Sequence, residues 1–350
     1  MKYRNLGSSN LDVSMVCLGS MTWGVQNNQE DANDQIEYAL DMGVNFIDTA
    51  ELYATPPAAE TYGKTESIIG NWIGKNQKKR ESFILASKIA GPGFGYIRNG
   101  SPITANSVKL AVDSSLKRLQ TDYIDLYQLH WPNRQNVHFG KHWPNQIRFS
   151  QTDANSQREQ MLDILEGLQE AVTAGKIRHC GLSDDSPWGV QTYLELSKKH
   201  DLPRMVSIQN EFNLLHTKDW PYLIEQCIQE DIAYLAWSPL AGGLLSGKYI
   251  NGARPVGSRW SMQQQNALFR DTKSCEYAVI ALSQIAQIHG YTTAQLALAW
   301  CNSIDGVTST IIGATTMDQL KENIAAFDKP FNEEVADEIG KILQEYPLPF

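Results

Sequence analysis

The sequence has few of the features that mark disulfide-rich, metal-binding or membrane proteins. Its five cysteines form no C-x-x-C pair and match no metal-ligand spacing. We therefore expect them to be buried free thiols in a reducing compartment. No stretch is long and apolar enough to span a bilayer, and no apolar leader follows Met1, so a cytoplasmic protein is expected. The five are Cys17, Cys180, Cys227, Cys275 and Cys301.

Basic side chains are also in deficit. The 350 residues include 30 Lys and Arg against 39 Asp and Glu, a formal net charge of −9 at pH 7. A nucleic-acid surface or a basic membrane patch needs the opposite balance, so neither partner is expected. Hydrophobic residues make up 42% and charged residues 20%, which is ordinary for a globular protein with a large core. No pattern indicates an oligomeric state.

Apolar segments that each end in an ionisable side chain are the main positive signal. Such segments precede Asp48, Lys88 and His130, and Tyr53 follows Asp48 in the next predicted loop. Continuous apolar runs are typical of buried parallel strands. In a closed barrel, parallel strands deliver the residues at their carboxyl ends to one rim. We therefore expect these four side chains to lie together.

Strand and helix patterns alternate along the chain. Residues 104–119, for example, carry apolar side chains at helical spacing, which predicts an amphipathic helix laid on a sheet. About eight strand–helix repeats follow one another, the number that closes a (β/α)8 TIM barrel of the α/β class. No shift in composition marks a boundary, so residues 1–350 are predicted to form a single barrel domain. The predicted additions are an N-terminal hairpin within residues 1–18, two long loops at 133–158 and 238–273, and extra helices near 275–289, 294–302 and 333–346.

The first long loop, 133–158, is polar and contains Trp, His and Pro. A loop of this length is usually functional, so we expect a lid or a substrate wall, with a merely tolerated insertion as the alternative. The next helix is predicted at about 161–174, ended by Gly175. Trp23 and Trp131 are expected beside the loop as walls of an apolar-faced pocket. Alternatively, these aromatic side chains pack the loop against the barrel.

Two glycine-rich segments come close to phosphate-binding motifs and fail in detail. Residues 91–96 (GPGFGY) follow a strand, but the dinucleotide fingerprint needs a glycine where Tyr96 stands. Residues 242–249 (GGLLSGKY) nearly match a P-loop, whose last position must offer Mg²⁺ a hydroxyl from the first turn of a helix. Tyr249 stands at that position, and Pro255 soon follows. Neither a dinucleotide fingerprint nor a P-loop is therefore predicted.

The four rim residues have a combined chemistry that none has alone. A tyrosine hydroxyl has an unperturbed pKa of about 10, so Tyr53 donates a proton poorly near neutral pH unless its phenolate is stabilised. Lys88 would provide that charge, and Asp48 would keep the lysine oriented and protonated. His130 is expected to orient a substrate oxygen or to tune the tyrosine. Each residue also has a purely structural interpretation, but their shared position favours the catalytic one.

The order and spacing of Asp48, Tyr53, Lys88 and His130 resemble the catalytic tetrad of the aldo-keto reductases, NADPH-dependent oxidoreductases built on a (β/α)8 barrel. The resemblance covers essentially the whole chain. The segments most similar to the family are 43–50 (GVNFIDTA), 175–178 (GKIR), 181–183 (GLS), 237–240 (WSPL) and 313–323 (GATTMDQLKEN). The last of these, with the insertion after His130, is most similar to the bacterial Tas-type branch.

The resemblance implies a role for each matching residue. Tyr53 would be the general acid in carbonyl reduction and the base in the reverse direction. Lys88 and Asp48 would lower its pKa, and His130 would orient the carbonyl. The residues implied to hold NADPH are Ser183 and Gln209 at the carboxamide, Trp237 at the nicotinamide ring, Ser238, Leu240, Gly242 and Lys248 at the pyrophosphate, Lys248 and Arg259 at the 2′-phosphate, and Gly313, Thr315, Gln319, Glu322 and Asn323 at the adenosine end. A cationic pair favours NADPH over NADH because it stabilises a phosphate dianion.

One position departs from the family pattern. Asp184 follows Ser183, where the family usually carries asparagine. An amide both donates and accepts hydrogen bonds, whereas an ionised carboxylate only accepts and adds charge. Asp184 is therefore interpreted as a cofactor contact that accepts from the carboxamide NH₂. The replacement of asparagine by aspartate is expected to affect cofactor affinity more than catalysis.

Together these features predict reduction of an aldehyde or ketone to an alcohol by NADPH, with Tyr53 protonating the nascent alkoxide. The expected partner is a small carbonyl compound that no residue identifies. Two other classes stay open. A cofactor-free barrel isomerase or lyase would use Lys88 and His130, and it would tolerate Lys248→Ala. A sensor that resembles potassium-channel β subunits would bind NADPH with little turnover and without dependence on the Tyr53 hydroxyl.

Overall fold

The centre of the molecule is a closed barrel of eight parallel strands, seen in a computed structural model that describes residues 1–135, 137–262 and 269–350. The strands are β3 (Val16–Gly19), β4 (Phe46–Asp48), β5 (Ile84–Ile89), β6 (Ile124–Leu129), β7 (Ile177–Ser183), β8 (Met205–Glu211), β9 (Ala233–Trp237) and β10 (Val307–Ile312). They pair in chain order, and β10 closes the ring against β3 and β9. The predicted (β/α)8 TIM barrel is confirmed.

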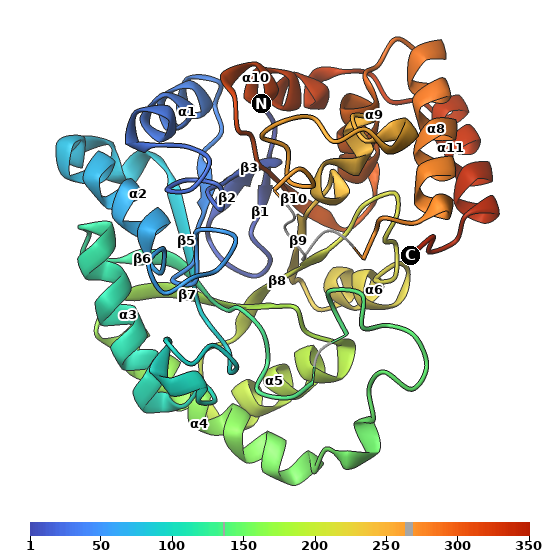
Figure 1. Cartoon of the computed structure of the whole chain (residues 1–350). Helices are drawn as coiled ribbons and strands as arrows, with labels where there is room; N and C mark the ends of the chain where they lie inside the picture. The colour runs from blue at the N-terminus through green and yellow to red at the C-terminus, as the bar shows by residue number, and fades with distance from the viewer. Residues whose placement is uncertain (136, 263–268) are drawn as a thin grey trace.

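Helices surround the barrel, as Figure 1 shows. They are α1 (Gln29–Asp41), α2 (Lys64–Lys75), α3 (Ala105–Leu119), α4 (Ala154–Thr173), α5 (Pro187–His200), α6 (Tyr222–Gln229), α8 (Lys273–Ile288), α9 (Thr293–Ser303), α10 (Met317–Ala325) and α11 (Glu333–Glu345). Buried side chains of these helices pack on the outer face of the strands in one large apolar cluster. The helices expected near 275–289, 294–302 and 333–346 are confirmed as α8, α9 and α11.

Helix boundaries follow from local capping chemistry. Thr104 caps α3, because its side chain accepts from the Ser107 N–H at 3.2 Å while the Ser107 hydroxyl accepts from the Thr104 N–H at 2.7 Å. The prediction that α4 begins near residue 161 was wrong. The helix begins at Ala154, because Asp153 accepts from the Ser156 N–H at 2.7 Å and provides an N-cap within the predicted loop.

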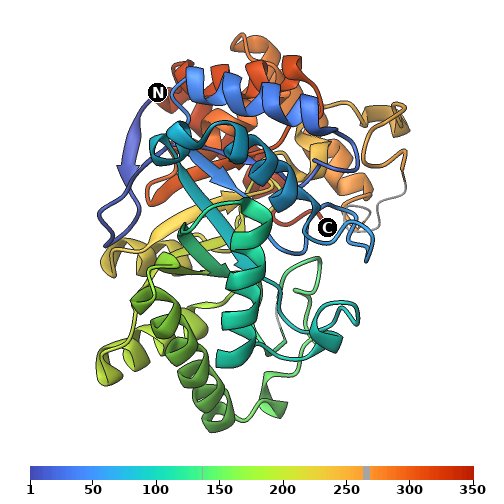
Figure 2. The ribbon, with the colours of Figure 1, turned by 90° about the vertical axis from the view of Figure 1, so that its left-hand side faces the viewer.

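The interior of the barrel changes from apolar to polar along its axis. Phe46, Ala86 and Leu126 belong to an apolar cluster at the amino end, which the predicted hairpin, β1 (Tyr3–Asn5) with β2 (Asp12–Ser14), covers. Figure 2 shows this hairpin at the left edge and the long loops on the opposite side. Two residues further along the same strands, side chains again point inward, and they are polar. The strand period therefore places Asp48, Lys88 and Gln128 in one layer.

All five cysteines are buried and free, as predicted. Within the three described ranges, no helix is both long enough and apolar enough to cross a membrane. The second long loop carries two short 3-10 helices, Ala241–Ser246 and Ile250–Gly252, before residues 263–268, which lie outside the described part of the chain.

Candidate active site

The four predicted catalytic residues meet at the carboxyl end of the barrel. Asp48 ends β4, Lys88 lies near the end of β5, and His130 directly follows β6. Lys88 is fully buried, and its Nζ donates to Asp48 Oδ2 at 2.5 Å and to the Thr49 carbonyl oxygen at 2.9 Å. A buried ion pair persists only with such close contact and extra hydrogen bonds. The pair is therefore held rigidly beside the loop that carries Tyr53.

Tyr53 faces both His130 and Lys88. Its hydroxyl lies 3.5 Å from His130 Nε2, and the two rings meet edge-on with centroids 5.4 Å apart. The Lys88 ammonium lies 5.0 Å from the centre of the phenol ring. No partner within the described residues contacts the buried His130 Nδ1. The hydroxyl and the imidazole thus keep capacity for a further hydrogen-bonding group.

Burial and charge set the protonation states of these groups. Burial raises the pKa of the Tyr53 hydroxyl above its ordinary value of 10, and the Lys88 charge opposes that rise whereas the Asp48 charge adds to it. The expectation that Lys88 and Asp48 together lower this pKa was therefore wrong for the protein without cofactor, because burial outweighs the lysine. Burial alone would lower the pKa of Lys88, but Asp48 and Tyr53 outweigh it and raise that pKa above 10.5. Burial, then the Lys88 charge, holds the pKa of His130 well below 6.5. At neutral pH the tyrosine is protonated, the lysine charged and the histidine neutral.

Two glutamine amides donate hydrogen bonds to Asp48. Gln209 Nε2 donates to Asp48 Oδ1 at 2.9 Å and to Gln128 Oε1 at 3.2 Å, and Gln128 Nε2 donates to Asp48 Oδ1 at 3.3 Å. The Gln209 side chain, assigned to the carboxamide by resemblance, thus also fixes the aspartate. Gln128 was missed in the sequence, although its spacing of two residues from His130 on one strand was a signal for the same face.

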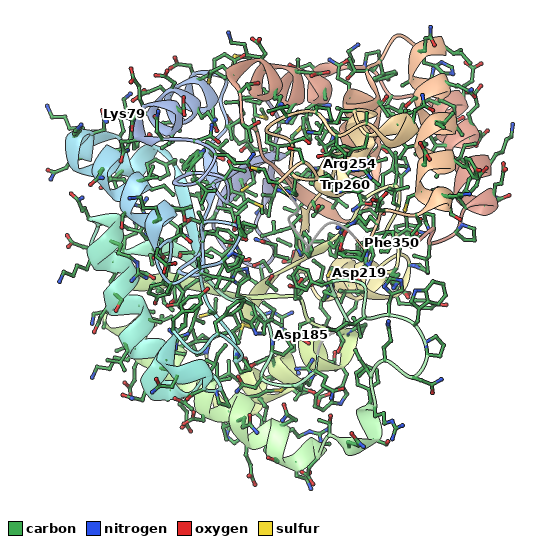
Figure 3. All side chains as sticks on the ribbon, in the orientation of Figure 1. Lys79, Asp185, Asp219, Arg254, Trp260 and Phe350 are labelled. Carbon is green, nitrogen blue, oxygen red and sulfur yellow. The ribbon has the colours of Figure 1, made fainter. Side chains whose placement is uncertain are left out.

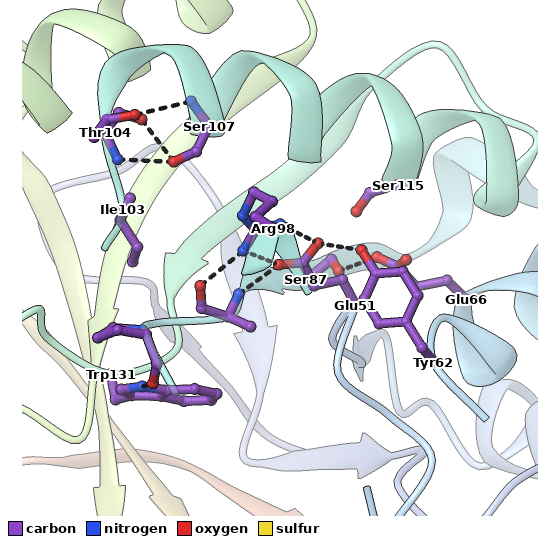
Figure 4. Close-up of polar contacts among 12 residues, drawn as sticks. Glu51, Tyr62, Glu66, Ser87, Arg98, Ile103, Thr104, Ser107, Ser115 and Trp131 are labelled. Atoms are coloured by element: carbon purple, nitrogen blue, oxygen red, sulfur yellow. Dashed lines mark hydrogen bonds and ion pairs between the residues drawn. The ribbon is translucent and has the colours of Figure 1, made fainter. Parts of the chain in front are cut away.

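The loop that carries Tyr53 is braced by a second buried carboxylate, shown in Figure 4. Both oxygens of Glu51 accept from Arg98, at 2.7 and 2.9 Å, and Tyr62 donates to the same carboxylate at 2.8 Å. The Ala90 N–H adds a bond of 2.7 Å. A bidentate arginine fixes the orientation as well as the position of a carboxylate. Glu51 therefore holds the Tyr53 loop against the loop after β5.

Apolar and aromatic side chains form a wall beside Tyr53. Leu52, Ala90 and Ile97 are buried in this small cluster, and Trp131 packs on it. Trp131 is tied by its indole N–H to the Pro92 carbonyl oxygen at 3.1 Å. Trp23 has a different position from the one expected. It is fully buried and donates to Gln35 of α1 at 3.0 Å, so it contributes no surface to an open pocket.

The residues implied at the nicotinamide lie next to the tetrad. Ser183 pairs with Gln209 across β7 and β8, and Asp184 follows directly. The Trp237 indole N–H donates to Asp184 Oδ1 at 3.0 Å. The insertion reaches this point as well, because Phe139 stacks on Trp237 with ring centroids 5.6 Å apart and planes inclined by 28°. Sequence reasoning gave no role to Phe139.

The implied phosphate residues follow β9 in a tight turn. Gly242 donates its N–H to Ser238 Oγ at 3.1 Å, and it has a φ of +69°, which favours glycine. Leu240 is partly buried in the same turn. Burial, then the charge of the neighbouring Arg259, lowers the pKa of Lys248. Burial, then the charge of Arg270, lowers the pKa of Arg259. The turn therefore gathers positive charge.

No carboxylate pairs with Lys248 or Arg259 in the described part of the chain, and residues 136 and 263–268 (N and QQQNAL) contain no acid. Arg259 instead donates to the Met21 sulfur at 3.8 Å, which brings its loop to the loop after β3. Two neighbouring cations without an anion suit a phosphate group. The donors in this region therefore fit the pyrophosphate and 2′-phosphate of NADPH.

The implied adenosine residues follow β10 and lie at the start of α10 and within it, and Asn323 among them is buried. Asn323 donates to the Gly313 carbonyl oxygen at 3.2 Å, and Gln319 Oε1 accepts from the Thr315 N–H at 2.9 Å and from its hydroxyl at 3.1 Å. Glu322 is partly exposed one residue before Asn323. Helix α10 begins here, so its N-terminal N–H groups lie beside these residues.

Comparison with known proteins agrees with this geometry. A sequence model of the aldo/keto reductase family matches residues 15–344. Protein tas of Escherichia coli (strain K12) is 43% identical over 352 residues, which cover 100% of this chain and 99% of that protein. Two further relatives are a probable voltage-gated potassium channel subunit beta of Arabidopsis thaliana, 30% identical over 359 residues (99% and 98%), and the uncharacterized oxidoreductase YrpG of Bacillus subtilis (strain 168), 29% identical over 343 residues (96% and 94%).

The chain therefore belongs to the aldo/keto reductase family of oxidoreductases. The resemblance found in the sequence is confirmed, including its relation to the Tas-type branch.

Proposed function

We propose that this protein reduces an aldehyde or ketone to an alcohol with NADPH and that Tyr53 protonates the carbonyl oxygen. The observation that carries the proposal is the meeting of the Tyr53 hydroxyl, the His130 imidazole and the buried Lys88–Asp48 pair beside an apolar wall. When bound, NADPH supplies the hydride. The residues of the chain orient the carbonyl, deliver a proton and exclude water.

The proton step depends on charge around Tyr53. The raised pKa keeps the Tyr53 hydroxyl protonated at neutral pH, so a proton is available for transfer to the carbonyl oxygen. As its proton leaves, the phenolate gains the attraction of the Lys88 ammonium, which Asp48 holds in place. Neutral His130 would donate an N–H to the same carbonyl oxygen in the Nε2–H tautomer. The two donors thereby select one orientation of the carbonyl.

NADPH is proposed over NADH because Lys248 and Arg259 lack a carboxylate partner. A 2′-phosphate supplies the missing negative charge, whereas a ribose hydroxyl does not. We further propose that residues 1–350 form one domain and that the protein is located in the cytoplasm, where free buried thiols such as these persist.

A second candidate function is an NADPH sensor with little turnover. The observation in its favour is the 30% identity to the Arabidopsis protein named as a potassium channel subunit beta. Both candidates need the nucleotide site, but only the reductase needs the Tyr53 hydroxyl.

The test is Tyr53→Phe, assayed with a panel of aldehydes and ketones by loss of NADPH absorbance. We expect kcat to fall about 10²–10⁴-fold, the usual contribution of a general acid, while NADPH affinity stays within about threefold. Tyr96→Phe, at an exposed tyrosine of the loop after β5, is the matched control and should keep its activity. Turnover unaffected by Tyr53→Phe would favour the sensor, and failure of the native protein to bind NADPH would overturn the proposed function.

A further inference from the structure

Asp184 stands in an unusual environment for a carboxylate. Its backbone is left-handed, with a φ of +50°, and only 3% of the residue is exposed. Oδ1 accepts the neutral indole N–H of Trp237 at 3.0 Å. The nearest basic nitrogen is His138 Nδ1, at 3.7 Å, and no hydrogen bond reaches Oδ2 from the described residues. The carboxyl group thus lies beside the implied carboxamide position without a cationic partner in contact.

The neighbouring Gln209 can offer only one kind of hydrogen bond there. Both N–H groups of its amide are used, one on Asp48 and one on Gln128, so its carbonyl oxygen is the group left over. A primary carboxamide carries an NH₂ group and a carbonyl oxygen. If its NH₂ group donates to Gln209, its oxygen needs a donor from the other side. The Ser183 hydroxyl can donate or accept and does not decide the matter.

The charges around Asp184 oppose its ionisation. Burial is the largest influence and raises the pKa of this carboxyl well above 3.8. The Trp237 N–H lowers it, Glu211 of β8 and Asp219 before α6 raise it, and Lys88 lowers it. Asp219, labelled in Figure 3, is itself held by Tyr234 and Asn210 at 2.7 and 2.8 Å.

The insertion places a neutral imidazole beside Asp184, and its buried cation, Arg134, pairs with the next residue, Asp185. His138 is buried, and neither ring nitrogen has a hydrogen-bond partner in the described residues. Burial, then His216, lowers the pKa of His138 to about 3; Lys218 also lowers it, and Glu211 opposes them. The imidazole beside Asp184 is therefore neutral at physiological pH, and no ion pair forms between the two.

We propose that Asp184 serves the nicotinamide carboxamide as a neutral carboxylic acid, which donates its proton to the carboxamide oxygen while its other oxygen accepts from Trp237. This inference rests on the proposed function, because it assumes that NADPH occupies the site. It explains how aspartate replaces asparagine: the acid offers one donor and one acceptor, as the amide does. A neutral Asp184 also adds no negative charge that would oppose the phenolate formed when Tyr53 gives up its proton.

The test compares native protein, Asp184→Asn and Asp184→Leu in binding two nucleotides. One is NADPH, and the other is its analogue with an acetyl group in place of the carboxamide, which keeps the carbonyl oxygen and lacks the NH₂ group. We expect Asp184→Asn to bind both within about threefold of the native protein. Asp184→Leu should weaken both by about tenfold, the value of one buried hydrogen bond. If Asp184 instead accepted from the NH₂ group, the effect of Asp184→Leu would disappear with the acetyl analogue, which would overturn the inference.

A second experiment measures NADPH affinity as a function of pH and does not require the leucine variant to fold. The protonated form binds, so native affinity should be retained at low pH and lost as the pH rises through the pKa of Asp184. The ratio of the native dissociation constant to that of Asp184→Asn cancels the titration of the phosphate and of Lys248. We expect this ratio to rise with pH. A ratio that rises as the pH falls, or a native dissociation constant far above that of Asp184→Asn at every pH, would overturn the inference while leaving the proposed function intact, whereas failure of the native protein to bind NADPH would overturn both.

Discussion

The two ends of the barrel each contain a buried ion pair, and the two pairs differ in how completely they are satisfied. At the amino end, Asp125 of β6 accepts from Arg80 at 2.7 Å, from Arg178 at 2.9 Å and from the Leu85 N–H at 3.0 Å. Arg80 and Arg178 each lie 4.0 Å from the ring centre of Tyr123. At the carboxyl end, Lys88 and Asp48 are as deeply buried, but the groups around them are incompletely paired.

This difference distinguishes a structural cluster from the proposed catalytic one. Arg80 also donates to the carbonyl oxygens of Phe83 and Tyr123 and to Thr121, so together with the bond to Asp125 four of its five N–H donors are used. Around Lys88, by contrast, the Tyr53 hydroxyl has one long contact and His130 Nδ1 has none among the described residues. Burial alone therefore does not identify a catalytic pair. Unfilled hydrogen-bonding capacity next to it does.

The strongest test of this contrast is Lys88→Met. The change leaves Asp48 buried without its counter-ion and removes the charge that stabilises the Tyr53 phenolate. We expect kcat to fall about 10²–10⁴-fold and the free energy of unfolding to fall by about 3–5 kcal/mol. Steady-state kinetics and urea unfolding measure the two effects. In the double variant Asp48→Asn with Lys88→Met, stability should partly return and activity should not; a return of activity would contradict the catalytic role.

At the amino end, Arg80→Met should damage stability alone. Asp125 would keep the Leu85 N–H but only one cation, the half-exposed Arg178, so we expect the free energy of unfolding to fall by about 3–5 kcal/mol. The kcat of the folded protein, measured well below its melting temperature, should not change. Arg178→Gln is the matched control, and it should cost less than about 1 kcal/mol because the pair is half-exposed. If Arg80→Met lowered kcat without lowering stability, the amino-end pair would have a catalytic role, which contradicts the assignment of catalysis to the carboxyl end.

A smaller effect is expected at the proposed phosphate site, where Lys248 has no carboxylate partner among the described residues. Lys248→Gln should weaken NADPH binding about 10–100-fold, the equivalent of one charge-assisted hydrogen bond, and should weaken NADH binding less, because NADH offers Lys248 the pyrophosphate but no 2′-phosphate. Fluorescence titration with each nucleotide measures both, and the exposed Lys75→Gln on α2 is the control. Equal losses for the two nucleotides would assign Lys248 to the pyrophosphate alone.

The smallest effect concerns the insertion. Phe139→Ala removes the ring that stacks on Trp237, and an aromatic pair contributes about 0.5–1.5 kcal/mol beyond its burial. We expect a stability loss of that size and a changed tryptophan emission. The control is Phe149→Ala, because Phe149 lies on the same insertion and is 59% exposed. Equal effects of the two changes would show that the stack is energetically neutral.

The sequence was sufficient to predict the barrel and the meeting of the tetrad, because strand alternation and strand ends are local signals. Asp48, Lys88 and His130 each end or follow an apolar run. Parallel strands bring their carboxyl ends to one rim of the barrel, so the three side chains meet there. The start of α4 was misplaced because a cap at Asp153 outweighed a polar composition that is typical of loops.

Contacts between distant loops carried no such signal. Nothing in the sequence pairs Glu51 with Arg98 or brings Phe139 to Trp237, because each contact depends on where two loops arrive after the barrel has closed. The burial of Trp23 was missed for a similar reason: its partner, Gln35, reaches it only through the packing of α1 on the barrel. Periodicity describes elements, whereas such pairs are properties of their assembly.

The seam of the barrel has a consequence for how the protein is made. Val16 and Leu18 of β3 pair with Thr310 and Ile312 of β10, so the ring closes between strands almost a whole chain apart. A growing chain on the ribosome contains the complete tetrad long before β10 exists, and such distant pairing is slow to form. A nucleotide that touches both sides of the seam would favour the closed ring by mass action. The proposed site would therefore be completed late, when β10 closes the ring against β3.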